Sequence, residues 1–166
     1  RVGIFMADNI IAAEAIDDLN GGFLTFYIDD AIYGIELLHV IEIVAVSPIT
    51  KVPNVPDYIK GIINLRGKIV PVIDVRLKFC QPEKEHDDKT CLIVVDIEGM
   101  HVGLIVGGVA EVVTVDKDNL AAPPDISTNM SNRYLQSIAK IGDRVILNID
   151  CMRFFQSDLT AAGFGR

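Results

Sequence analysis

Tyr33–Val46 reads YGIELLHVIEIVAV, and Val102–Val115 reads VGLIVGGVAEVVTV. At this offset of 69 residues, most positions pair one apolar residue with another. The identical pairs are Gly34/Gly103, Val40/Val109, Glu42/Glu111, Val44/Val113 and Val46/Val115. Self-similarity at a fixed offset indicates a fold assembled from copies of one unit.

The repeat extends to both sides of these stretches. Upstream, the same offset places Phe23-Leu24 on Leu92-Ile93. Downstream the offset becomes 76, with the matches Tyr58/Tyr134, Ile62/Ile138, Ile73/Ile149 and Asp74/Asp150. Chance similarity between strands rich in Val and Ile is the alternative. Matches that keep their order over three consecutive segments favour a duplicated chain.

Each copy has the composition of β structure, because Val, Ile, Phe and Tyr suit a pleated, half-buried surface. We predict one hairpin per copy followed by a closing strand. The expected strands are Phe23–Ile28, Ala31–Ile35, Cys91–Ile97, Met100–Val106, Lys68–Val75 and Arg144–Ile149. Short strands with regular turn signals predict an all-β fold of small barrels or a sandwich.

The connecting segments carry different signals. Ser47–Pro56 contains three prolines and is expected to be extended without joining a central strand. Gln81–Lys89 is charged and predicts a solvated linker between the copies, and Asp116–Arg133 predicts a surface loop. Asn9–Leu19 has apolar residues on one helical face and predicts a helix. Gly107-Gly108 is expected to bend the long strand of the second copy.

Composition excludes several classes of protein. The chain has 166 residues, half of them apolar, and a net charge of −8. Its longest stretch without a charged residue, Gly99–Ala110, is too short for a membrane span. The acidic balance argues against nucleic acid as a partner. Three cysteines without a C-x-x-C spacing suit a reducing compartment, so we expect a cytoplasmic protein.

Catalytic and metal-binding signatures are not found in the sequence, which predicts no enzymatic activity, no cofactor and no metal. His39 and His101 are expected on strand faces, and His86 lies in the charged linker. The alternative is a small β-barrel enzyme that pairs His39 or His101 with Cys91 or Cys151. That alternative requires nucleophile and base to converge in a cleft.

The charge distribution singles out Arg66. The segment Lys51–Lys78 has six basic and two acidic residues, so it is net +4 in an acidic chain. Its lysines, Lys78 included, are interpreted as ordinary surface residues. Arg66 instead lies in Asn64-Leu65-Arg66-Gly67, where Asn64 and Gly67 suit a tight turn with the arginine at its tip. Burial of Arg66 against a carboxylate between the barrels is the alternative.

The run YIKGIINLRGKIVPVIDVR, from Tyr58 to Arg76, closely resembles the signature of the CheW-like domain family of chemotaxis coupling proteins. The resemblance covers Gly22 to about Phe155. It implies two small five-stranded Src-homology-3-like (SH3-like) β-barrels with short flanking helices. It also implies a non-catalytic adaptor that couples methyl-accepting chemoreceptors to the histidine kinase CheA.

The family's partner surface carries over to four residues in a groove between the barrels. Val40 and Val112 are expected to form its apolar floor, while Glu42 and Arg66 are expected to fix the position of the partner through polar contacts. Asn64 and Gly67 support the Arg66 turn. The implied partners are the regulatory domain of CheA and the cytoplasmic tips of chemoreceptors, without nucleic acid or membrane insertion. The implied location is cytoplasmic, at membrane-associated receptor arrays.

The expected organisation has three parts. Residues 1–21 form an N-terminal segment, part of which is foreign to the natural chain if that chain starts at Met6. Residues 22–156 form the CheW-like domain, with one barrel at about 22–80 and the other at about 90–156, and 157–166 form a tail. A piece of a longer CheV-type protein and the regulatory portion of the kinase are alternatives.

The sequence departs from the family pattern at a few positions. Gly107-Gly108 stands where an acidic residue and a glycine are usual. Asn148 interrupts a closing strand that is normally apolar, so its amide needs a partner inside the fold. Ala139-Lys140 and Cys151-Met152 are also atypical. These departures concern local packing rather than function.

Overall fold

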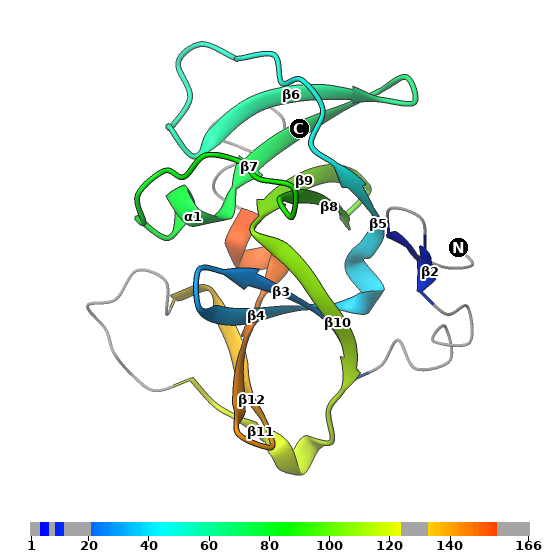
Figure 1. Cartoon of the computed structure of the whole chain (residues 1–166), viewed down its shortest axis with the longest axis vertical. Helices are drawn as coiled ribbons and strands as arrows, with labels where there is room; N and C mark the ends of the chain where they lie inside the picture. The colour runs from blue at the N-terminus through cyan, green and yellow to red at the C-terminus, as the bar shows by residue number, and fades with distance from the viewer. Residues whose placement is uncertain (1–3, 7–8, 12–20, 124–132, 156–166) are drawn as a thin grey trace.

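A computed structural model describes residues 4–6, 9–11, 21–123 and 133–155. These residues form two β-sheets, one above the other in Figure 1, with short helical segments between and beside them. The all-β prediction is confirmed, and the two sheets fit the SH3-like description. In the described part, no helix is both long and apolar enough to cross a bilayer.

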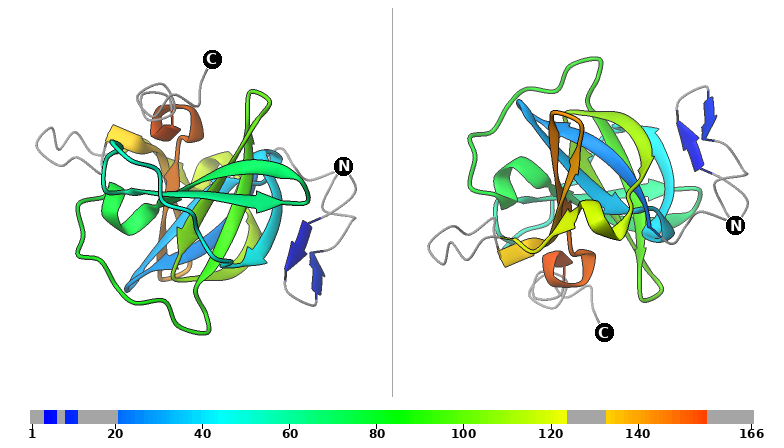
Figure 2. Two further views of the ribbon diagram at one scale, coloured as in Figure 1. Left: turned by 90° about the horizontal axis from the view of Figure 1, so that it is seen from above. Right: turned by 90° about the horizontal axis from the view of Figure 1, so that it is seen from below.

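The first sheet has seven strands in the order β2-β1-β5-β8-β9-β7-β6. Its strands are β1 (Ile4–Met6), β2 (Asn9–Ile11), β5 (Val40–Ala45), β6 (Ile59–Leu65), β7 (Lys68–Asp74), β8 (Cys91–Ile97) and β9 (Met100–Val106). The hairpin of β1 and β2 lies at one side of the molecule (Figure 2) and touches β5 through the pair Met6 and Ile43. The helix α1 (Val75–Lys78) follows β7 directly.

The second sheet has six strands in the order β10-β3-β4-β13-β12-β11. Its strands are β3 (Gly22–Ile28), β4 (Ala31–Glu36), β10 (Gly108–Thr114), β11 (Leu120–Ala121), β12 (Leu135–Ile141) and β13 (Arg144–Ile149). Two 3₁₀ turns, η2 (Leu37–His39) and η3 (Lys117–Asn119), precede β5 and β11. Residues 151–155 form a helical turn after β13.

The two sheets repeat one pattern, as the sequence repeat predicts. β5-β8-β9-β7-β6 matches β10-β3-β4-β13-β12 strand for strand. In both sheets the third and fourth strands of this order are parallel and the other neighbours are antiparallel. The irregularities repeat as well. A register shift at Ile59/Gly61 in β6 recurs at Leu135/Ser137 in β12, which is the sequence offset of 76.

The sheets do not divide the chain at the linker, in contrast to the predicted barrels at 22–80 and 90–156. The hairpin β3–β4 comes from the first half of the chain but pairs with β10 and β13 of the second. The hairpin β8–β9 comes from the second half but pairs with β5 and β7 of the first. Because the hairpins carry the same sequence pattern, each fits the place of the other.

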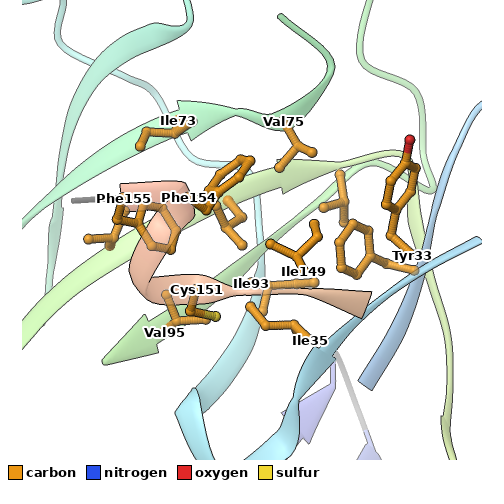
Figure 3. Close-up of a cluster of buried hydrophobic side chains, with 14 of the residues drawn as sticks. Tyr33, Ile35, Ile73, Val75, Ile93, Val95, Ile149, Cys151, Phe154 and Phe155 are labelled. Atoms are coloured by element: carbon orange, nitrogen blue, oxygen red, sulfur yellow. The ribbon is translucent and has the colours of Figure 1, made fainter. Parts of the chain in front are cut away.

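Each sheet curves around a small core of its own, and a larger core joins the two. Residues from β5 and β6, at opposite ends of the five-strand order, pack together around Val70 and Leu92 in the first sheet. Phe23, Val115, Ala139 and Ile146 form the corresponding core of the second. Between the sheets, Phe154 and Phe155 pack over Ile73, Val95 and Cys151 (Figure 3).

Two expectations for local structure are wrong. The helix predicted from Asn9 is contradicted at its start, since Asn9–Ile11 is β2, and the remainder lies outside the described residues. Pairing with a neighbouring strand overrides the helical spacing of the apolar residues there. Lys78 is not a surface lysine, because only 4% of it is exposed.

Candidate functional site

Glu42 and Arg66 meet across the first sheet. Glu42 lies on β5, and Arg66 lies in the turn between β6 and β7, at the other end of the five-strand order β5-β8-β9-β7-β6. The Nη2 of Arg66 donates to Oε1 of Glu42 at 2.7 Å, and Nη1 donates to Oε2. This bidentate geometry is the one that arginine and a carboxylate favour, so the pair joins the two ends of the five-strand order β5-β8-β9-β7-β6.

The turn that carries Arg66 has the geometry predicted from its sequence. Arg66 and Gly67 both have positive φ, at 54° and 84°, as a two-residue turn matched to strand twist requires. The N–H of Gly67 donates to Oδ1 of Asn64 at 2.8 Å. An arginine in this left-handed conformation is uncommon, which makes its position at the tip a feature to explain.

The environments of the two partners differ sharply. The side chain of Arg66 is 69% exposed, whereas that of Glu42 is 9% exposed. Arg66 is therefore presented at the turn tip, and it also holds a carboxylate that is itself buried. The hydrogen bonds and charge of Glu42 raise the pKa of the Arg66 guanidinium, which keeps it charged. Its outward face retains donors that a partner can reach.

The two valines of the predicted groove differ in accessibility. Val40 is 0% exposed and belongs to the core between the sheets, so its side chain cannot form a groove floor. It lies on β5 next to a register shift between Val40 and Glu42. Val112 is partly buried against the same core, and part of its surface stays accessible.

A second glutamate and arginine pair, which the sequence reading missed, occupies the equivalent place in the second sheet. Glu111, the repeat partner of Glu42, lies on β10, and Arg144 begins β13 next to the β12–β13 turn. Arg144 Nη1 donates to Glu111 Oε2 at 2.6 Å. Both side chains are nearly half exposed. The identity of Glu42 and Glu111 in the repeat was the available signal.

The basic segment does not form a continuous patch. Lys60 pairs with Glu83 of the linker at 2.7 Å. Arg76 pairs with Asp29 of the β3–β4 turn. With Arg66 bound to Glu42 and Lys78 buried, Lys51 and Lys68 are the two of the six cations that are exposed and have no ion pair among the described residues.

The alternative of a cysteine and histidine enzyme gains no support from the geometry. Cys91 and His101 lie at opposite ends of the β8–β9 hairpin, five residue pairs apart, which is about 17 Å at strand spacing. Burial raises the pKa of the Cys91 thiol to about 11 and that of Cys151 well above its usual range. His39 ends η2 beside Glu36 rather than lying on a strand.

A pocket of about 410 Å³ lies away from the predicted residues. It is lined by the linker, the β3–β4 turn, the start of α1 and the bend at Gly107, and its lining includes charged residues of both signs. Within the described ranges, histidine, cysteine and acidic residues nowhere gather in threes with metal-binding geometry. The structure brings Glu42 and Arg66 together on the first sheet, whereas Val112 lies on β10 of the second sheet. The Glu42–Arg66 pair and Val112 are the candidate partner-binding residues.

Comparisons with known proteins agree with this fold. The family model for the CheW-like domain matches residues 22–159. "Chemotaxis protein CheW" of Klebsiella aerogenes is 35% identical over 136 residues, which is 82% of either chain. The protein of that name from Treponema pallidum is 28% identical and covers 86% of both.

A solved structure also matches. It is the scaffolding protein TtCheW from Thermoanaerobacter tengcongensis, with 36% sequence identity and a TM-score of 0.71. The match covers 78% of this chain and 83% of that one. The likeness therefore extends over both sheets of the fold.

Proposed function

The chain belongs to the CheW-like domain family, and from this membership we propose that it is a non-catalytic scaffold that couples chemoreceptors to the histidine kinase CheA. The single observation that carries the proposal is the family match across 22–159. The name of the curated relatives places them in chemotaxis, and the solved relative is described as a scaffolding protein.

The geometry of the site supports a contact role for Arg66. A guanidinium that is two-thirds exposed, fixed at a turn tip by Glu42, is pre-organised for a partner and loses little freedom on binding. Arginine is enriched at the residues that dominate binding energy. We assign the receptor contact to Arg66 and the accessible part of Val112, with Glu42 as the group that orients Arg66.

The roles of the other predicted residues follow from their surroundings. Val40 supports the site from within the core and makes no direct contact. Asn64 and Gly67 hold the turn. The partners in this proposal are the regulatory domain of CheA and receptor tips, at cytoplasmic receptor arrays, and neither nucleic acid nor membrane insertion has a part.

A reconstitution tests the proposal. Membranes that contain a chemoreceptor are mixed with purified CheA, with or without this protein, and kinase autophosphorylation is measured. The proposal predicts that receptor control of the kinase requires the protein. It also predicts that kinase, receptor and this protein sediment together. Equal kinase control in its absence, with no co-sedimentation, would contradict the proposal.

Val112→Asp tests the apolar part of the site in the same assay. A carboxylate there would lose its water when a partner covers it, so receptor binding is expected to weaken. Because Val112 is partly accessible, the variant is expected to keep its circular dichroism spectrum. If Val112→Asp unfolds the protein, Val112 belongs to the core alone and leaves the site.

A further inference from the structure

The two halves of the chain are interlocked rather than adjacent. We call residues 21–80 the N-half and residues 91–155 the C-half. Four ladders join them, from β5 to β8, β7 to β9, β3 to β10 and β4 to β13. Within its own span the N-half has the hairpin ladders β3–β4 and β6–β7 and one isolated bridge between Thr50 and Ile62. Neither half can complete a five-strand unit without the other.

The core between the sheets also draws on both halves. Phe79 of the N-half stacks on Tyr33 at 5.1 Å and meets the edge of Phe154 of the C-half at 5.7 Å. Lys78 of the N-half lies over Tyr58 and over its repeat partner Tyr134, with Nζ 4.5 and 5.0 Å from the ring centres. The contact between halves is thus apolar, extensive and central.

The covalent connection between the halves is slight by comparison. Residues 81–90 run over the surface as a long loop without helix or strand (Figure 2). Glu83 pairs with Lys60 there, and Asp87 closes a local turn with Thr90. All ladders and core contacts between the halves would persist if this loop joined different molecules.

We propose that residues 81–90 act as a hinge through which two copies of this chain exchange halves. In the exchanged dimer, the N-half of one copy completes both sheets with the C-half of the other. The closed monomer and the dimer contain the same ladders and differ in the path of the hinge. A connection of this length gives the attached half an effective concentration of the order of millimolar. Exchange therefore competes with closure at about 1 mM chain and is rare in the micromolar range.

The experiment uses the full chain with a protease site inserted between Glu85 and His86. The protein is unfolded, refolded at about 1 mM and at about 10 µM, and separated by size. Dimers are expected from the concentrated sample only. When the isolated dimer is cut at the inserted site, it should fall apart into two particles of monomer size, each with one N-half and one C-half. The uncut dimer is the control.

Three results would overturn the proposal. The concentrated sample could remain monomeric, or the dimer could survive cutting at its full size, as a surface contact between closed copies would. The cut halves of the monomer could also separate.

In a second arm, unlabelled and ¹⁵N-labelled chains are cut, mixed, unfolded and refolded. Native mass spectrometry should show light, mixed and heavy pairs at a ratio of about 1:2:1 if the halves recombine freely.

Discussion

Arg66 occupies a backbone conformation that glycine adopts at lower cost, and in the second sheet the equivalent residue is Gly142. A left-handed residue other than glycine persists where its surroundings compensate for the strain. The bonds to Glu42 supply that compensation in part. The guanidinium remains largely exposed, so it is accessible to a binding partner. This is the residue-level reason to propose a partner contact there.

Gly34 and Asn148 should depend on each other. Asn148 is fully buried, its Nδ2 donates to Ser137 at 3.1 Å, and its Oδ1 has no hydrogen-bond partner among the described residues. A Cβ at Gly34 would lie 2.4 Å from that Oδ1. Gly34→Ala is expected to lower the free energy of unfolding by about 2 kcal/mol, as overpacking does.

A double-mutant cycle checks this dependence. Adding Asn148→Ala to Gly34→Ala should cost at least about 1 kcal/mol less than the sum of the single changes in urea unfolding. Gly103→Ala is the matched control, because Gly103 is the repeat partner of Gly34 and faces Leu92 instead. Its effect should add to that of Asn148→Ala. Additive effects in the Gly34 cycle would show that the two residues are independent.

The three thiols should differ in reactivity. Cys80 is exposed, whereas Cys91 is partly buried and Cys151 buried. With a pKa of about 11, Cys91 is thiolate in only about one molecule in a thousand at pH 8. Ellman's reagent is therefore expected to titrate one thiol rapidly in the native protein and three in urea. Rapid reaction of Cys91 or Cys151 in the native protein would contradict this prediction and would favour the alternative of a cysteine and histidine enzyme.

At the scale of elements, α1 places a cation in an aromatic cage. Burial, together with repulsion from Arg133, lowers the pKa of Lys78 to about 8 from its usual 10.5. As the pH rises, Lys78 therefore loses its proton at a lower pH in the folded state than in the unfolded state. The contribution of Lys78 to stability is expected to rise as the pH rises from about 8 to 10.5, and to be constant below that window.

Lys78→Met isolates this contribution, because methionine keeps the length and apolar stem without the charge. The difference in unfolding free energy between wild type and Lys78→Met should move in favour of the wild type from pH 8 to pH 10. The difference is the quantity to compare, since raised pKa values of Tyr33, Tyr58 and Cys91 act in the opposite direction in both proteins. Parallel pH curves would contradict the assignment.

The elements differ in how far their sequence predicts them. Both long hairpins are predictable with their turns, because runs rich in Val, Ile, Phe and Tyr that are interrupted by Asp29-Asp30 or Glu98-Gly99 are local signals. The cage around Lys78 was not predicted. Its rings come from Tyr58, Tyr134 and Phe154, and the two of the C-half meet Lys78 only through the tertiary fold. The Arg66 turn was predicted, but its bond to Glu42 on a distant strand was not.

At the scale of the whole molecule, the repeat predicted two similar units but not their composition. A sequence repeat states that two hairpins are alike, and it carries no information on which three strands each hairpin joins. The ladders between β5 and β8 and between β3 and β10 settle that point. Because each hairpin pairs with strands from the other half of the same chain, the core between the sheets contains residues of both halves. The relative position of the two sheets therefore depends on both halves.

The same repeat supplies the control for the central claim. Arg66 and Arg144 each bind one of the two repeat-related glutamates, and of these two arginines the family resemblance assigns a partner contact only to Arg66. Loss of an ion pair is common to Arg66→Ala and Arg144→Ala. Because Glu42 is buried and Glu111 is nearly half exposed, the two losses are not identical, so a difference in partner binding reports the contact only when both variants are shown to be fully folded.

The most direct measurement is the affinity of wild type, Arg66→Ala and Arg144→Ala for receptor-containing membranes in the presence of CheA, by co-sedimentation. Arg66→Ala is expected to bind about tenfold or more weakly, as for a dominant interface residue, with its circular dichroism spectrum retained. Arg144→Ala is expected to bind within about twofold of wild type. Wild-type binding by a folded Arg66→Ala protein would contradict the account.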